Sequence, residues 1–260
     1  MRKYLQAVRL FVVTSFAAEM EYRINFVLAA ASSLLSLAGS IFSLSLFYRA
    51  GHRLGGWAWP DALLVMGMFT LLDGVAATWL SPNLNRIVDH ARDGTLDFVL
   101  LKPVDSQFWV STRYVSVWGF PNVIFGVALI VVAGTVRGLS AADYAAGLAP
   151  LLLGTVILYS LWFLLASTCV WFVKIYNVTY VLRSLLEAGR YPAQAYPAAY
   201  RFVFTFVLPV AFLTTVPAQA MLGTARLQSL GLATALAAGL FLAARAFWRL
   251  ALRYYTSASS

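Results

Sequence analysis

The chain has 260 residues, of which 61% are hydrophobic and only 11% are charged, whereas a soluble domain carries about a quarter charged residues. A water-soluble fold of this size cannot hide so much apolar surface, so lipid must surround much of the chain. The net charge of +9 does not indicate a nucleic-acid partner, because the basic residues fall in short loops between apolar runs, where they set topology and contact anionic lipid. With one cysteine, Cys169, and two histidines in separate loops, we expect neither a disulfide nor a metal site.

The first 19 residues predict an amphipathic helix that lies on the membrane surface. Apolar residues recur at helical spacing and polar residues cover the other face: Leu5, Val8, Val12 and Phe16 against Arg2, Gln6, Arg9 and Glu19. A cleavable signal peptide is the alternative, because two basic residues precede the apolar stretch 10–18. Cleavage after that stretch would leave Glu19 outside the cell, against the topology predicted below.

Six apolar segments predict an all-α membrane domain that covers residues 1–260 as a single unit. A spanning helix needs about 20 apolar residues, and the segments lie at about 24–48, 62–80, 108–134, 144–173, 202–216 and 227–247. Gly119 and Pro121 predict a kink in the third. The fifth is too short to span unless residues 217–225 form a re-entrant hairpin, with which Pro209 and Pro217 are consistent.

Basic residues are distributed unequally between the two sides of this arrangement. Fifteen of the nineteen Lys and Arg residues fall on the side of the N-terminus, residues 83–113, residues 174–201 and the C-terminal tail. The other side has four, which are Arg49, Arg53, Arg137 and Arg226. The positive-inside rule therefore places both termini in the cytoplasm, which requires an even number of spans.

The chain has no recognisable site for ATP hydrolysis or for other hydrolytic chemistry. A P-loop needs a glycine directly before its lysine, because glycine lets backbone amides surround a phosphate. The three lysines, Lys3, Lys102 and Lys174, follow Arg2, Leu101 and Val173 instead. Neither a His-Glu-x-x-His nor a Gly-x-Ser-x-Gly motif is present. We therefore expect a protein that is not an enzyme and binds no cofactor.

Residues 83–103 predict a short amphipathic helix at the cytoplasmic side, followed by a turn. Its apolar face is Leu84, Ile87, Val88 and Ala91. Gly94 ends the helix, Pro103 breaks the run after it, and Asp105 or Ser106 is suited to cap the next helix. One interpretation is an interfacial helix that only seals the loop. The other is a docking helix that takes force from a soluble partner.

A second polar segment precedes the fifth apolar run. Arg183 and Glu187 are four residues apart and can pair on a helix. Gly189 can end that helix and Pro192 prevents its continuation. The segment is either a helix end with a solvated ion pair, which contributes little, or a cytoplasmic gate or elbow.

Asp73 is the one acidic residue deep within a predicted span. A charge at that depth is expensive and marks a candidate for the substrate path. The alternative is that Asp73 is protonated, or bonded to a neighbouring helix, and only supports packing.

Two sequence stretches resemble the ABC type-2 permeases, which are the transmembrane subunits of ABC exporters. The first is residues 93–104, and the second combines residues 187–192, 196–197, 201, 205–212 and 216–218. Together with the surface helix and the six-span layout, the resemblance extends over nearly the whole chain. It implies an inner-membrane permease that pairs with itself or with a second permease, docks on cytoplasmic ATPases that bind ATP and magnesium, and exports a hydrophobic or amphipathic substrate.

The resemblance also implies roles for particular residues. The ATPase-coupling helix would present Arg86, Asp89, His90, Arg92, Asp93, Gly94, Leu96, Asp97, Lys102 and Pro103. The gate or elbow would contain Arg183, Glu187, Gly189, Arg190, Tyr191, Pro192, Arg201, Pro209 and Pro217. Three other functions stay open on the residues alone: an ion-coupled secondary transporter, for which Asp73 is thin support, a membrane enzyme, and a non-transporting scaffold.

Overall fold

The computed structural model describes residues 2–19, 23–49, 51, 53–172, 184 and 186–255, and all regular structure within them is helical. Five helical runs are long and apolar enough to cross a membrane. They are α2 (Arg23–Arg49), the run Trp59–Arg92, the run Val117–Arg137, the run Ala141–Val170, and α12 (Leu227–Tyr254). A sixth is present if one bent helix pair is counted as a span. The predicted all-α integral membrane fold is confirmed.

The second span is longer than expected. α3 (Trp59–Val75) continues through a π-helical turn (Ala76–Leu80) directly into α4 (Ser81–Arg92). We expected the span to end at Ser81 and Pro82, but the helix continues past Pro82, and the π-helical turn lies directly before the position where the proline removes one backbone hydrogen bond. The predicted amphipathic helix is therefore continuous with the second span.

The third span starts later than expected. α6 (Ser106–Thr112) is a separate short helix, and a 3-10 turn (Val117–Gly119) then leads into α7 (Phe120–Arg137). The predicted kink is thus a complete break at residues 113–116. α8 (Ala141–Ser167) begins earlier than predicted, because Ser140 and Asp143 form a capping box, with Asp143 Oδ2 accepting hydrogen bonds from the backbone N–H and the hydroxyl of Ser140, each at 2.8 Å.

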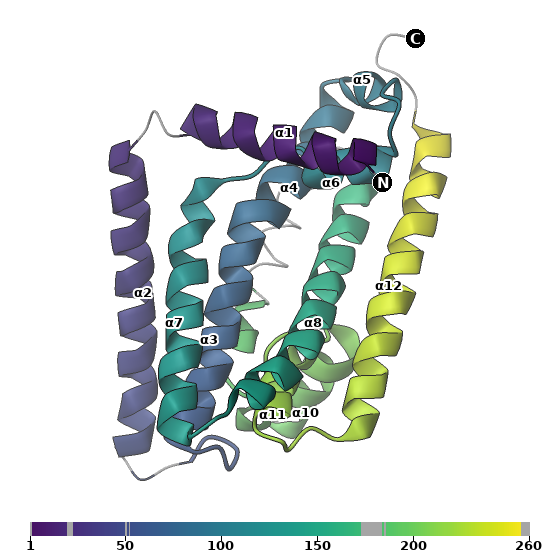
Figure 1. The fold of residues 1–260 in the computed structure, drawn as a ribbon. Helices are drawn as coiled ribbons and strands as arrows, with labels where there is room; N and C mark the ends of the chain where they lie inside the picture. Colours follow the sequence, from purple (N-terminus) through teal and green to yellow (C-terminus); the bar gives the residue numbers. More distant parts are fainter. Residues whose placement is uncertain are drawn as a thin grey trace.

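Two ends of the bundle can be distinguished in Figure 1. The α1 end carries α1 (Arg2–Glu19), which lies across the spans, together with α4, α5 (Leu96–Leu100), α6 and the last turns of α12. The α11 end carries the loops at residues 51–58, 138–140 and 222–226, with α10 (Ala198–Phe202) and α11 (Thr215–Met221) beside them.

The predicted helix α1 is confirmed, and two of its side chains also contact the rest of the protein. Phe11 is buried, and its ring meets the ring of Trp109 on α6 edge to face at 5.0 Å. Ser15 Oγ accepts a hydrogen bond from the backbone N–H of Val115 at 3.3 Å. Val12 and Phe16 of the predicted apolar face are exposed, where lipid can cover them. The contacts of Phe11 and Ser15 hold α1 against α6 and the chain that follows it.

Close glycine contacts join α3 to α7. A Cβ atom on Gly74 would lie 2.4 Å from the backbone nitrogen of Val123, and one on Gly126 would lie 2.4 Å from that of Leu71. Each helix therefore contributes a glycine at which the neighbouring backbone approaches more closely than any side chain would allow, which is a common way to pack membrane helices.

The fifth segment differs most from expectation. Cys169 donates a hydrogen bond to the carbonyl of Ile87 on α4 at 3.8 Å, whereas Gln194 accepts one from Trp57 in the loop between α2 and α3 at 3.1 Å. The chain thus passes from the α1 end to the α11 end between residues 169 and 194, and residues 173–183 within that stretch lie outside the described ranges.

Residues 198–221 then form a helical hairpin. The helix Ala198–Val207 and the segment Val210–Met221 are bent by 73° at Leu208 and Pro209. Residues on both sides of the hairpin, Gln194 and Thr224, line one cavity together with Trp57. The hairpin therefore enters and leaves at the α11 end, and the predicted segments 202–216 and 217–225 both lie in this bent helix pair.

This arrangement changes the distribution of basic residues. Arg201 lies in α10 near the α11 end, and Arg190 lies within the bundle, whereas we expected both at the cytoplasmic side. The bias nevertheless keeps its direction, because the α1 end has Arg9, Arg86, Arg92, Lys102, Arg113, Arg245, Arg249 and Arg253 and the α11 end has Arg49, Arg53, Arg137, Arg201 and Arg226.

Candidate functional site

α4 is anchored on one side and charged on the other. Leu84, Ile87 and Val88 are buried in the main core, which also contains Phe163 of α8 and Trp248 of α12. On the other side the guanidinium of Arg86 stacks on the Tyr114 ring, 3.7 Å from its centroid. The predicted apolar periodicity is confirmed, and it now belongs to a helix that is packed against the spans.

The turn after α4 is held by local polar contacts. Arg92 pairs with Asp93 at 2.8 Å and with Asp89 at 3.5 Å, and the hydrogen bond from Arg92 lowers the pKa of Asp93 below its ordinary value. Gly94 has φ +66°, a left-handed conformation that glycine adopts without strain. His90 Nδ1 and Thr95 Oγ1 are 2.7 Å apart, which fixes the start of α5.

α5 presents two large apolar side chains outward. Leu96 and Val99 are 0% and 4% exposed, whereas Phe98 and Leu101 are 66% and 80% exposed. Leu96, a predicted coupling residue, is thus an anchor that faces the bundle. We define the α5 tip as the outward set at this end of the molecule, where α5 protrudes beyond the other helices (Figure 1): Arg92, Asp93, Phe98, Leu101 and Lys102.

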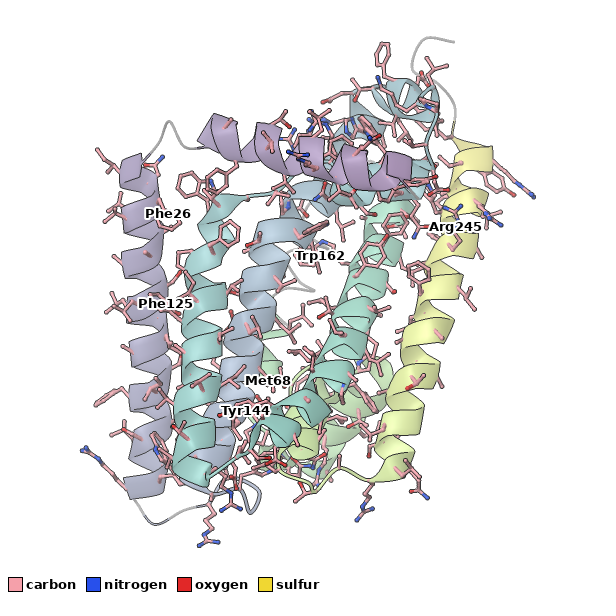
Figure 2. All side chains as sticks on the ribbon, viewed as in Figure 1. Phe26, Met68, Phe125, Tyr144, Trp162 and Arg245 are labelled. Carbon is pink, nitrogen blue, oxygen red and sulfur yellow. The ribbon has the colours of Figure 1, made fainter. Side chains whose placement is uncertain are left out.

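The chain leaving α5 is tied to two spans. Asp105 caps α6, accepting from the N–H of Phe108 at 3.0 Å, and it forms a two-point ion pair with Arg245 of α12. This bonding holds the pKa of Asp105 below its ordinary value. Ser106 Oγ accepts from the indole N–H of Trp248 at 3.0 Å. Figure 2 shows Arg245 on α12 beside α8, close to the α1 end.

Tyr159 of α8 completes this junction. Its hydroxyl accepts from Gln107 Nε2 at 3.1 Å and lies 2.8 Å from Ser111 Oγ. We call the set Asp105, Gln107, Tyr159 and Arg245 the latch. Sequence reasoning identified Asp105 only as a cap, and no local pattern pairs it with an arginine 140 residues away.

Asn83 joins the second span to the chain before the third. It is 1% exposed, and its Nδ2 donates to the carbonyls of Trp79 and Tyr114 at 2.7 and 2.6 Å. Its Oδ1 accepts from the N–H of Tyr114 at 2.9 Å. One amide side chain therefore satisfies both backbone groups of Tyr114 in a stretch that has no helix of its own.

Asp73 lies in a polar cluster within the span region. Asn122 of α7 donates to Asp73 Oδ2 at 2.7 Å. Arg190 pairs with Glu187 at 2.7 Å, donates to the hydroxyl of Ser40 on α2 and stacks on Phe69 at 4.9 Å. We define the Asp73 cluster as Ser40, Asp73, Asn122, Glu187 and Arg190. The structure brings together Asp73 and two predicted gate residues that sequence analysis treated separately.

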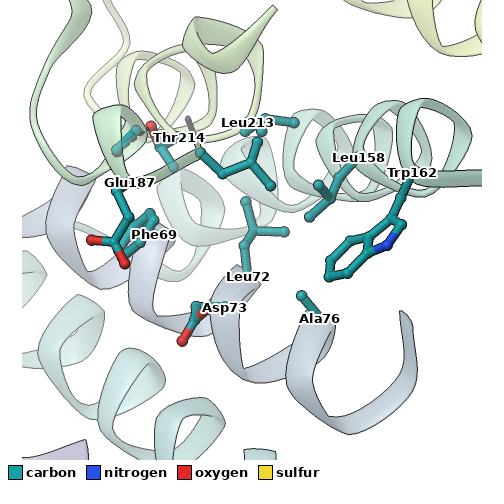
Figure 3. Close-up of a pocket in the computed structure, with 11 residues that line it drawn as sticks. Phe69, Leu72, Asp73, Ala76, Leu158, Trp162, Glu187, Leu213 and Thr214 are labelled. Carbon is teal, nitrogen blue, oxygen red and sulfur yellow. Dashed lines mark hydrogen bonds between the residues drawn. The ribbon is translucent and has the colours of Figure 1, made fainter. Parts of the chain in front are cut away.

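The Asp73 cluster borders two small cavities of about 30 Å³ each. Figure 3 shows the first, where Asp73 and Glu187 lie on one side and the apolar side chains of Leu158 and Trp162 lie on the other. The second is lined by Ser33, Ser36 and Ser40 of α2 together with Thr70, Asp73 and Arg190. This surface has a polar and an apolar half at membrane depth.

Apart from Arg183, the predicted gate residues extend from the Asp73 cluster to α10 and α11. Thr214 Oγ1 donates to the carbonyl of Gly189 at 2.8 Å, and the Tyr196 hydroxyl donates to that of Ala188 at 2.9 Å. Tyr191 and Pro192 follow as extended backbone, Pro209 lies at the hairpin bend and Pro217 in the first turn of α11. Arg183 lies outside the described residues, and Glu187 pairs with Arg190.

No metal site emerges from the residues whose positions are described, among which no group of three His, Cys, Asp or Glu side chains could hold an ion.

Lys102 of the α5 tip lies over the Trp109 ring at 5.7 Å, and Pro103 follows it in the turn before α6.

Residues 34–259 match a protein-family model described as ABC-2 family transporter protein. No curated protein and no solved structure matches the chain. The family match covers all of the described elements except α1 and the first part of α2, up to and including Ser33.

Proposed function

Because the chain belongs to the ABC-2 transporter family and is a permease component of an ABC transporter, we propose that it exports an amphipathic substrate and is driven by a separate ATPase that docks on the α5 tip. Members of this family are multi-pass transmembrane components that associate with ABC ATPase subunits and are not themselves catalytic.

The exposed apolar pair on the α5 tip is the observation that carries this proposal. Phe98 and Leu101 protrude at an end of the molecule where the neighbouring side chains are charged. Burial of each side chain in a partner contributes about 1.5–3 kcal/mol to the free energy of binding. Arg92, Asp93 and Lys102 surround them and suit the rim of such an interface, where charges set orientation more than affinity.

The helices behind the tip support transmission of force. α4 continues without interruption into the second span, so a push on the tip tilts that span as a rod. The latch joins the other end of α5 and α6 to α8 and α12. ATP binding in the partner would therefore move three spans together.

The Asp73 cluster is the proposed substrate path. Charged and polar groups at membrane depth are costly to expose to lipid even when they are paired, so a surface with Asp73, Glu187 and Arg190 favours contact with protein or water. The serines of α2 belong to the same surface, and α2 is the most exposed of the five spans. We propose that a second permease, identical or different, faces it. A path with a polar and an apolar half suits an amphipathic substrate.

We propose that the protein lies in the inner membrane and that its α1 end faces the cytoplasm. The excess of Lys and Arg at that end supports this orientation, and α1 fits a helix held at the membrane boundary. Both termini would then be cytoplasmic.

Co-purification tests the proposal. The affinity-tagged chain, extracted from its native membrane in mild detergent, should retain a stoichiometric ATPase with a Walker motif. The double variant Phe98→Ser with Leu101→Ser should lose it, because the affinity falls at least about a hundredfold. Leu227→Ser is the matched control, since Leu227 is 85% exposed at the α11 end. Retention of the ATPase by the double variant, or its absence from the wild type, would contradict the proposal.

A further inference from the structure

A groove between α6, α8 and α12 opens near the α1 end and plays no part in the docking proposed above. Its volume is about 400 Å³, within the range of ligand pockets. Aromatic side chains form much of its wall: Trp79, Phe108, Tyr159 and Phe241.

The polar atoms of the groove are already bonded to one another. Gln107 and Ser111 contact the Tyr159 hydroxyl, and Thr112 Oγ1 donates to the carbonyl of Phe108 within α6 at 2.7 Å. Asp105 is paired with Arg245. The wall that remains for a ligand is therefore mostly carbon, which favours a hydrocarbon chain.

Cations continue from the groove along α12. Arg249 and Arg253 follow Arg245 at intervals of four residues, which puts them on one face at steps of about 6 Å. Both are exposed, and neither has a carboxylate within ion-pair distance in the part of the chain that the structure describes. They carry positive charge that the latch does not neutralise.

The groove also lies at the depth of the surface helix. Tyr4, in the first turn of α1, meets Phe108 of the groove wall edge to face at 4.7 Å. An amphipathic helix of this kind lies at the boundary between head groups and acyl chains. The basic side chains thus reach head-group level while the aromatic wall extends toward the acyl chains.

We propose that the groove binds one anionic phospholipid, with an acyl chain along Trp79, Tyr159 and Phe241 and the phosphate at Arg249 and Arg253. Net negative charge distinguishes this lipid from a zwitterionic one. Because α6 and α12 both form the groove, the bound lipid braces the junction that the latch holds.

Two measurements on the full chain test this site. Lipid that survives purification in mild detergent is counted by native mass spectrometry, and the melting temperature is compared in nanodiscs of phosphatidylglycerol and of phosphatidylcholine. We expect one retained anionic lipid per chain and a higher melting temperature in phosphatidylglycerol. Thr112→Trp fills the groove and should lose the retained lipid.

Arg249→Gln leaves the packing intact, so it remains informative even if Thr112→Trp folds poorly. It should lower the preference for phosphatidylglycerol about fivefold. Arg226→Gln removes another exposed arginine, directly before the opposite end of the same helix, and should change nothing. The proposal would be overturned by equal retention of both lipids, by an effect of Arg226→Gln as large as that of Arg249→Gln, or by a non-lipid molecule in the groove. None of these outcomes bears on ATPase docking.

Discussion

The amide of Asn83 should be one of the strongest single stabilising groups at the α1 end. Asn83→Ala removes the bonds to both backbone groups of Tyr114, at 2.6 and 2.9 Å, and the bond to Trp79. A buried backbone group left without a partner costs about 1–3 kcal/mol. Two such groups would cost roughly 2–6 kcal/mol, and partial access of water to half-buried Tyr114 places our expectation at about 3 kcal/mol.

Unfolding in mixed micelles of dodecyl maltoside and dodecyl sulfate, followed by tryptophan fluorescence, measures this loss. Asn85→Ala is the control, because Asn85 is exposed on the same helix and bonds only the Ser81 hydroxyl, at 3.1 Å. It should change stability by less than about 0.5 kcal/mol. Asn83→Asp keeps the size but replaces the donating NH2 by a carboxylate oxygen, an acceptor that faces two carbonyls, so it should destabilise at least as much as alanine. Equal stability of Asn83→Ala and Asn85→Ala would refute this reasoning.

Two further predictions concern packing and pH. Gly74→Ala should destabilise the α3–α7 contact by about 1–3 kcal/mol in the same assay, while Gly39→Ala, with nothing within 4 Å, should be neutral. Because the native pKa of Asp105 is lowered, its pairing with Arg245 stabilises above the unfolded pKa of about 4 and is lost as pH falls through the lower native value. Asp105→Asn should thus lower the free energy of unfolding by about 1 kcal/mol at pH 7 and flatten the pH dependence of the melting temperature between about pH 5 and 3. Parallel curves of melting temperature against pH for the variant and the wild type would exclude this.

The sequence predicted the helical class, the surface helix and the amphipathic face of residues 84–91, because each depends on a local apolar period. It did not separate outward from inward residues of α5. Leu96 and Val99 are buried and Phe98 and Leu101 exposed, a division that depends on how α5 docks on α4. Five residues are too few for a period to identify the buried face.

The difference at the fifth segment has another physical origin. Residues 202–216 are apolar because a re-entrant hairpin passes through the same medium as a span, so hydropathy does not distinguish the two. Pro209 was informative, since the chain turns back at that point. The segment that crosses before it is harder to recognise, because it contains Glu187 and Arg190.

Arg190 explains why counting basic residues misplaced this segment. The positive-inside rule applies to charges that remain in water at the membrane ends. Arg190 instead lies within the bundle, where Glu187, the hydroxyl of Ser40 and the face of Phe69 compensate its charge. Compensation of this kind removes much of the cost of burial, so an arginine can lie between two spans. A paired charge of this sort near Asp73 is therefore better evidence for an internal polar surface than for a cytoplasmic loop.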